Sequence, residues 1–88
     1  MLVKVVFSGW VQGVGFRYTA QEFALECAVF GTIRNQVDGS VELYAQGSKE
    51  NIDALVNKLK NYFGKYIENI DIQDIKSAEN YTDFRIVR

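Results

Sequence analysis

One segment of the chain combines glycines with an arginine in a pattern suited to binding an anion. Residues 9–17 read GWVQGVGFR and lie between a predicted strand and a predicted helix. The glycines allow positive φ angles and let the backbone approach a ligand closely. Successive N–H groups can then form a concave anion site. The N-terminus of the following helix adds further free N–H donors. The positive charge of Arg17 interacts unfavourably with the helix dipole in the first turn. Its presence there is explained if its guanidinium binds an anion through two hydrogen bonds. On spacing alone, a glycine-rich turn with a surface arginine explains the segment equally well.

The segment matches neither of two common phosphate-binding motifs. Its glycines do not have the G-x-G-x-x-G spacing of dinucleotide-binding loops, and no Gly-Lys-Ser/Thr ends it as in a Walker loop. An anion site in this segment is therefore of a third kind.

The composition limits which other chemistry the chain can perform. Its 88 residues are 48% hydrophobic and 24% charged, as in one ordinary globular domain. It has no histidine and one cysteine, which excludes imidazole chemistry, an internal disulfide and a cysteine zinc site. Ten basic and eleven acidic residues give a net charge of -1, which argues against nucleic-acid and membrane partners. Because no apolar run approaches the roughly 18 residues that span a bilayer and no signal peptide is recognisable, we expect a cytoplasmic protein.

The elements that must position the segment have the order βαββαβ, with a further short strand at the end. The pattern also predicts a hairpin turn at Asp38-Gly39 and a second helix that is capped by Ser48 and followed by Gly64 at its C′ position. This order predicts a ferredoxin-like α+β sandwich, in which two helices cover one face of an antiparallel sheet. The predicted strands are 2–9, 29–35, 40–46, 66–75 and 83–88, and the first helix is 16–27.

Three stretches of the chain carry a resemblance to a known family. Residues 11–17 (VQGVGFR) resemble the signature of acylphosphatases, residues 31–42 (GTIRNQVDGSVE) match a second element of that family, and residues 84–88 (FRIVR) are similar to its C-terminal strand. The stretches have the family's order and spacing along essentially the whole chain. The resemblance therefore implies a single acylphosphatase-like domain over residues 1–88.

The resemblance implies hydrolysis of the carboxyl–phosphate bond of small acyl phosphates to a carboxylate and orthophosphate. It assigns Arg17 to phosphate binding, and it assigns Asn35 to holding the attacking water. The backbone amides that it assigns to the phosphate are those of Gln12, Gly13, Val14, Gly15, Phe16 and Arg17. Without the resemblance, Asn35 would be interpreted as a turn former before Asp38-Gly39.

The chemistry of an acyl phosphate suits these few residues. Its leaving group is a carboxylate, whose acid has a pKa of about 4–5, so it can depart without being protonated. Phosphoryl transfer through a loose transition state needs mainly positioning and charge stabilisation, which the amides and Arg17 can supply, while the carboxamide of Asn35 can orient a water. We therefore expect direct attack by water, without a metal, a cofactor or a covalent phosphoenzyme.

Two positions depart from the family's pattern. The family often has a glycine where this chain has Ala28, near the end of the first helix, and an aromatic residue where this chain has Thr32. Either Ala28 adopts a left-handed cap conformation and is strained, or the helix ends differently. Neither departure touches Arg17 or Asn35.

Other reactive residues carry weaker signals. Cys27 closes a helix and lies seven positions before Arg34, so it does not fit the Cys-x5-Arg motif of tyrosine phosphatases and is interpreted as a core residue. Asp71 and Asp74 would face opposite ways in a strand, so solvated positions are expected for both.

Three residues near the segment are harder to assign. Trp10 either contacts the acyl group of the substrate or packs against the helix, and we favour packing. Arg34 lies either near the site or on the surface. The resemblance places the end of the chain close to the active site, which makes the terminal carboxylate of Arg88 a candidate partner for Arg17.

Two other functions compete with hydrolysis. Acylphosphatase-like domains also occur inside larger proteins such as hydrogenase maturation factors, so the alternative is a non-catalytic phosphate-binding or regulatory module. The RNA-recognition motif shares the predicted fold, but residues 41–45 (VELYA) lack its basic and aromatic pattern. The presence of both Arg17 and Asn35 favours the enzyme, which we expect to be a monomer that acts on a small acyl phosphate.

Overall fold

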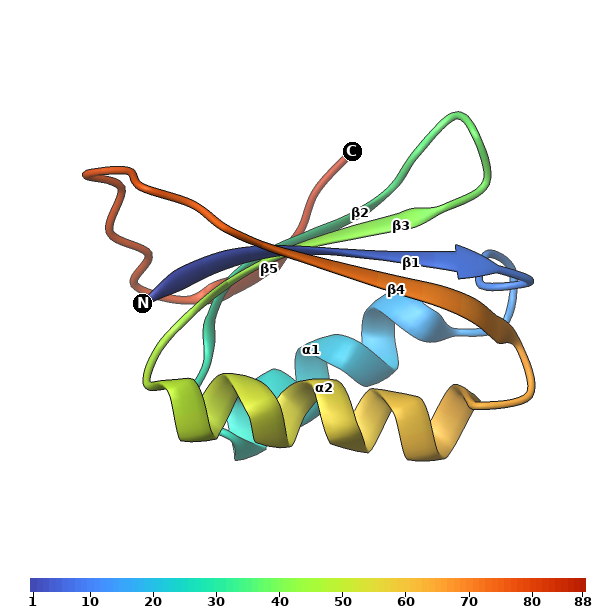
Figure 1. Ribbon diagram of the computed structural model, residues 1–88, viewed down its shortest axis with the longest axis horizontal. Coiled ribbons are helices and arrows are strands. Elements are labelled where there is room, and N and C mark those ends of the chain that lie inside the picture. Colours follow the sequence, from blue (N-terminus) through green and yellow to red (C-terminus); the bar gives the residue numbers. More distant parts are fainter.

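The computed structural model describes residues 1–88 as five strands and two helices (Figure 1). Their order is the predicted one. The largest difference in bounds is at the last strand, expected over residues 83–88, because only three of its residues pair with a neighbouring strand. The elements are β1 (Leu2–Gly9), α1 (Phe16–Glu26), β2 (Phe30–Asn35), β3 (Val41–Gln46), α2 (Lys49–Phe63), β4 (Ile67–Asp74) and β5 (Phe84–Ile86).

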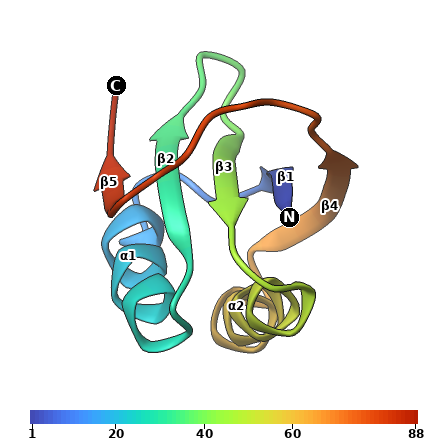
Figure 2. The same ribbon diagram turned by 90° about the vertical axis from the view of Figure 1, so that its left-hand side faces the viewer.

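The five strands form one sheet in the order β4-β1-β3-β2-β5. β1 is antiparallel to β3 and β4, and β2 is antiparallel to β3, as predicted. β5 instead runs parallel to β2, so the expected antiparallel sheet is wrong for its last strand. The reason is geometric. β4 runs opposite to β2, and the chain leaves β4, crosses the sheet and enters β5 at the same end, so β5 must run along β2 (Figure 2).

Both helices cover one face of the sheet, and residues 75–83 cross the other face (Figure 2). The core lies between helices and sheet, where burial of each large apolar side chain contributes about 1.5–3 kcal/mol. It includes three inward-facing residues of β1, three of β3 and the apolar stripe of α2: Val3, Val5, Phe7, Val41, Leu43, Ala45, Ile52, Leu55, Val56, Leu59 and Phe63. β1 leads into the glycine-rich loop and β3 leads out of the hairpin, so this core fixes both segments. Neither helix combines the length and the apolar character that a membrane crossing requires.

The helix ends depart from the sequence prediction at one position. Ser48 caps α2 as predicted, because its Oγ accepts a hydrogen bond from the amide of Asn51 at 3.1 Å. Gly64 was expected at the C′ position but is the C-cap residue, with a right-handed φ of -49°, and the chain continues into a turn closed by a hydrogen bond from the Tyr66 amide to the Phe63 carbonyl at 2.8 Å. After α1, Ala28 adopts the left-handed conformation with a φ of 55°, and it therefore carries the strain expected there.

Candidate active site

The loop between β1 and α1 has the backbone that its glycines predict. Gly13 and Gly15 have φ angles of 79° and 80°, and a Cβ atom at either position would meet nothing within 4 Å. Glycine is thus required there by the backbone conformation and not by crowding. Gly15 is the N-cap of α1, which has no side-chain cap and no acidic residue in its first turn. The amides at this helix end therefore lack the usual partner within the chain.

Two apolar residues hold the loop from either side. Val11 is 1% exposed and Phe16 is 2% exposed. The Phe16 ring lies 4.6 Å from the ring of Phe63 in α2 and 4.9 Å from that of Phe7 in β1, measured between centroids. Fixing both ends limits the conformations of the four residues between them, which keeps their amides in a defined arrangement.

The side chain of Gln12 joins this loop to the hairpin between β2 and β3. Its Nε2 donates hydrogen bonds to the carbonyl of Gln36 at 2.8 Å and to the carbonyl of Ser40 at 2.9 Å. Figure 1 shows the loop and the hairpin at the same end of the sheet. Because Asn35 is the last residue of β2 and directly precedes Gln36, the loop lies beside the strand end that carries Asn35.

The hairpin is itself held by polar side chains. The hydroxyl of Ser40, a buried residue, donates to Asp38 Oδ1 at 2.6 Å, and the Ser40 amide donates to the same oxygen at 2.9 Å. These hydrogen bonds, that from the hydroxyl above all, lower the pKa of Asp38. Glu42, also buried, accepts from Arg34 Nε at 2.9 Å and from Gln36 Nε2 at 3.1 Å. Arg34 is therefore engaged by Glu42 on the face opposite the helices.

The two residues predicted to be catalytic are both half-buried. Arg17 lies in the first turn of α1 and takes part in none of the ion pairs of the structure. The terminal carboxylate of Arg88 is consequently not paired with it, which contradicts that hypothesis for this conformation. Asn35 and Arg88 instead line a shallow pocket of about 470 Å³ beside the hairpin.

The structure also settles several weaker interpretations. Trp10 is 76% exposed, so the expected packing against the helix is wrong. Its backbone amide donates a hydrogen bond to the Tyr66 carbonyl at 2.8 Å, so the main chain is held here although the side chain is exposed. Cys27 packs against the core, as expected, and Asp71 and Asp74 are both exposed. No three His, Cys, Asp or Glu side chains gather closely enough to hold a metal ion.

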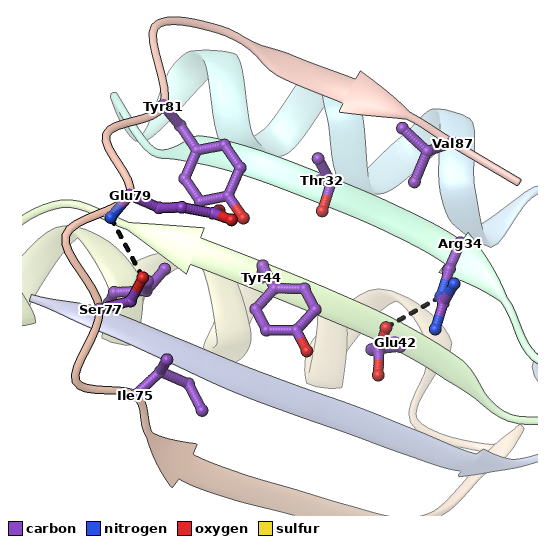
Figure 3. Close-up of a pocket in the computed structure, with 10 residues that line it drawn as sticks. Thr32, Arg34, Glu42, Tyr44, Ile75, Ser77, Glu79, Tyr81 and Val87 are labelled. Atoms are coloured by element: carbon purple, nitrogen blue, oxygen red, sulfur yellow. Dashed lines mark hydrogen bonds and ion pairs between the residues drawn. The ribbon is translucent and has the colours of Figure 1, made fainter.

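A second pocket, of about 410 Å³, lies on the sheet face opposite the helices (Figure 3). Tyr44 and Thr32 project into it from β3 and β2, and Tyr81 and Glu79 line it from the crossing segment. Burial, together with the nearby Glu79, raises the pKa of Tyr81 to about 12. This pocket contains neither Arg17, nor Asn35, nor any residue of the glycine-rich loop, so it is separate from the candidate active site.

Sequence reasoning gave Gln12 a backbone role only and missed its side chain. The partners of that side chain are main-chain carbonyls 24 and 28 positions away. Every residue has a carbonyl, so no residue type in the sequence marks such partners.

Known proteins resemble this chain in both sequence and structure. The acylphosphatase family model matches residues 3–86. The chain is 37% identical over 86 residues to an acylphosphatase of Oceanobacillus iheyensis. The aligned region covers 96% of this chain and 94% of the relative. It is 43% identical over 81 residues to an acylphosphatase of Paenarthrobacter aurescens. That aligned region covers 91% of this chain and 86% of the relative. The crystal structure of acylphosphatase from Bacillus subtilis superimposes with a TM-score of 0.90 at 32% identity and covers 100% of both chains.

The fold and the loop define an α+β domain of ferredoxin-like topology with a glycine-rich loop and an uncapped helix N-terminus at its first strand–helix junction. Within that class, the chain belongs to the acylphosphatase family. This confirms the predicted family and fold, and with them the prediction of an acylphosphatase-type hydrolase.

Proposed function

We propose that the protein hydrolyses the carboxyl–phosphate bond of small acyl phosphates, releasing a carboxylate and orthophosphate. The observation that carries this proposal is the hydrogen-bonded junction at Gln12, which places the Gly13–Gly15 loop beside the strand end of Asn35. In this proposal the loop binds the phosphate and Asn35 orients the water, so the two roles fall on neighbouring segments. Family membership supports the same reaction.

In this proposal the phosphate is held by the loop and by Arg17. The amides of residues 12–17 donate hydrogen bonds to its oxygens, and the uncapped N-terminus of α1 adds its positive dipole end. The Arg17 guanidinium, which has no acidic partner in the protein, is available for two parallel bonds to phosphate oxygens. Donors fixed before the reaction stabilise the charge that builds up on these oxygens in the transition state.

The attacking water is oriented by Asn35. Its carboxamide offers both an acceptor and donors, so it can align a water without removing a proton. The loose transition state demands little of the nucleophile, and a phosphate oxygen of the substrate takes the proton afterwards. The carboxylate leaves unprotonated because its acid has a pKa of only about 4–5. No covalent phosphoenzyme and no metal take part in this scheme.

Benzoyl phosphate hydrolysis in the presence of excess EDTA tests the proposal. We expect turnover that the chelator does not reduce, and none with a phosphate monoester such as p-nitrophenyl phosphate, whose leaving group is poorer. Turnover that EDTA abolishes would contradict the metal-free scheme. Binding of orthophosphate without any turnover would favour the non-catalytic binding module instead.

The proposal also treats residues 1–88 as a single domain that works as a monomer in the cytoplasm. The core is continuous from β1 to α2, which supports one folding unit. Light scattering coupled to size-exclusion chromatography tests the monomer, and a mass near 20 kDa, about twice the chain's 10.0 kDa, would contradict it.

A further inference from the structure

We propose that the side chain of Gln12 is a positioning residue that sets the alignment between the bound phosphate and the water held by Asn35. This inference rests on the proposed function, because it concerns the geometry of that same site. It goes beyond the backbone role of Gln12, since it concerns the carboxamide, which reaches the hairpin and not the phosphate.

The hydrogen bonds of Gln12 use both N–H groups of its carboxamide. The Ser40 carbonyl also accepts from the amide of Gln36 at 2.8 Å, and the Gln36 carbonyl also accepts from the amide of Gly39 at 3.1 Å. Gln12 thus bonds to the two carbonyls that close the hairpin turn, each of which has a second lone pair to offer. Loss of this side chain would release the hairpin from the loop without breaking the hairpin's own bonds.

The connection matters because the two halves of the site come from different elements. The pairing of β1 with β3 ends at Phe7 and Val41. Beyond that pair, the loop is held by Val11 and Phe16 within the core, whereas Asn35 depends on the end of β2. Gln12 is the polar side chain that spans the interval between them.

Replacement of Gln12 by Met keeps the length and much of the volume of the side chain but removes both donors. We expect kcat for benzoyl phosphate to fall 10- to 100-fold, because a misplacement of about 1 Å between reacting groups can cost about 100-fold. The inhibition constant of orthophosphate should change by less than about threefold, since the loop amides and Arg17 remain. A loss that appears in phosphate binding, with kcat unchanged, would overturn the proposal.

Gln21→Met is the matched control. Gln21 Nε2 also donates to a distant main-chain carbonyl, that of Phe84 at 2.9 Å, but it ties α1 to β5 and not to the hairpin. We expect both variants to lose similar stability in urea denaturation and only Gln12→Met to lose kcat. Equal losses of kcat in Gln12→Met and Gln21→Met would contradict the positioning role and leave Gln12 with a structural role only. If Gln12→Met does not fold, Gln12→Ala replaces it in the experiment. The short alanine side chain places no apolar group against the carbonyls of Gln36 and Ser40.

An Asn35→Ala background separates positioning from a direct role. If Gln12 acts through Asn35, adding Gln12→Met to Asn35→Ala should lower kcat by less than about threefold, because effects that share one pathway are not additive. Multiplying effects would overturn the inference while leaving the hydrolysis proposal intact. Failure of the proposed function is recognised separately, because the unmodified protein would then show no turnover at all.

Discussion

The two helices of this protein both follow a strand of the same sheet, yet their N-termini are built in opposite ways. α2 begins with Ser48, whose hydroxyl oxygen accepts from a backbone amide, and has the acidic Glu50 in its first turn. α1 begins with the left-handed Gly15, has no side-chain cap and carries Arg17 instead of an acidic residue. The Ser48 side chain caps the first turn of α2, whereas no side chain caps the first turn of α1, where Arg17 stands. The α2 junction is stabilised within the chain, and the α1 junction is the proposed anion site.

Removal of the cation at each junction gives the largest expected contrast. Arg17→Ala should lower kcat/KM for benzoyl phosphate by about 100- to 1000-fold, the loss typical of one preorganised donor. Lys49→Ala, the matched change in the first turn of α2, removes only an exposed pair with Asp53 at 2.8 Å and should leave kcat/KM unchanged. Near-normal turnover by Arg17→Ala would contradict the proposal that the α1 junction binds the substrate and the α2 junction does not.

Orthophosphate should stabilise the protein through the α1 junction. At a phosphate concentration 100 times its Kd, ligand binding adds about 2.7 kcal/mol to the free energy of unfolding. Urea denaturation at matched ionic strength, with phosphate or with chloride, measures this gain. Arg17→Ala should lose most of it and Ser48→Ala should keep it. A gain that is the same in both variants would mean that phosphate binds elsewhere.

Ser48→Ala should show the reverse profile at the α2 junction. Loss of the N-cap hydrogen bond is expected to lower the free energy of unfolding by about 1 kcal/mol. The activity of the folded protein should not change, because α2 begins at the opposite end of the sheet from the hairpin (Figure 1). Denaturation and steady-state kinetics on the same preparation check both parts, and reduced kcat/KM would show that the junctions are coupled.

Ala28→Gly gives the smallest effect and concerns the far end of α1. A left-handed alanine is strained by about 1–2 kcal/mol, and the extra chain entropy of glycine in the unfolded state offsets about 0.4–1 kcal/mol of the gain. We expect a net stabilisation of about 0.5 kcal/mol in urea denaturation, with unchanged kinetics. Destabilisation would indicate that the strain at Ala28 is already relieved by its surroundings.

The structural features that could be predicted from the sequence are those that depend on local patterns of residues. Element order, the Ser48 cap and the positive φ angles of Gly13 and Gly15 follow from periodicity and from residue types with few alternatives. The roles of Arg17 and Asn35 came from a motif, and they stay predictions until the variants are measured.

The parts that sequence could not predict depend on distant partners. The direction of β5 follows from where the chain leaves β4, and the bonds of Gln12 end on main-chain carbonyls with no side-chain signature. Trp10 was expected to pack against the helix, but it is exposed, whereas the neighbouring Val11 is buried.

The strand order has one more consequence, at the margin of the sheet. β4 is an edge strand of eight residues, and such a long edge offers unpaired backbone groups to other molecules. It carries Glu68, Asp71 and Asp74, all exposed. A second copy that aligned its own β4 alongside would bring carboxylates together, and like charges on neighbouring strands repel. The acidic side chains of β4 therefore disfavour edge-to-edge pairing of two copies.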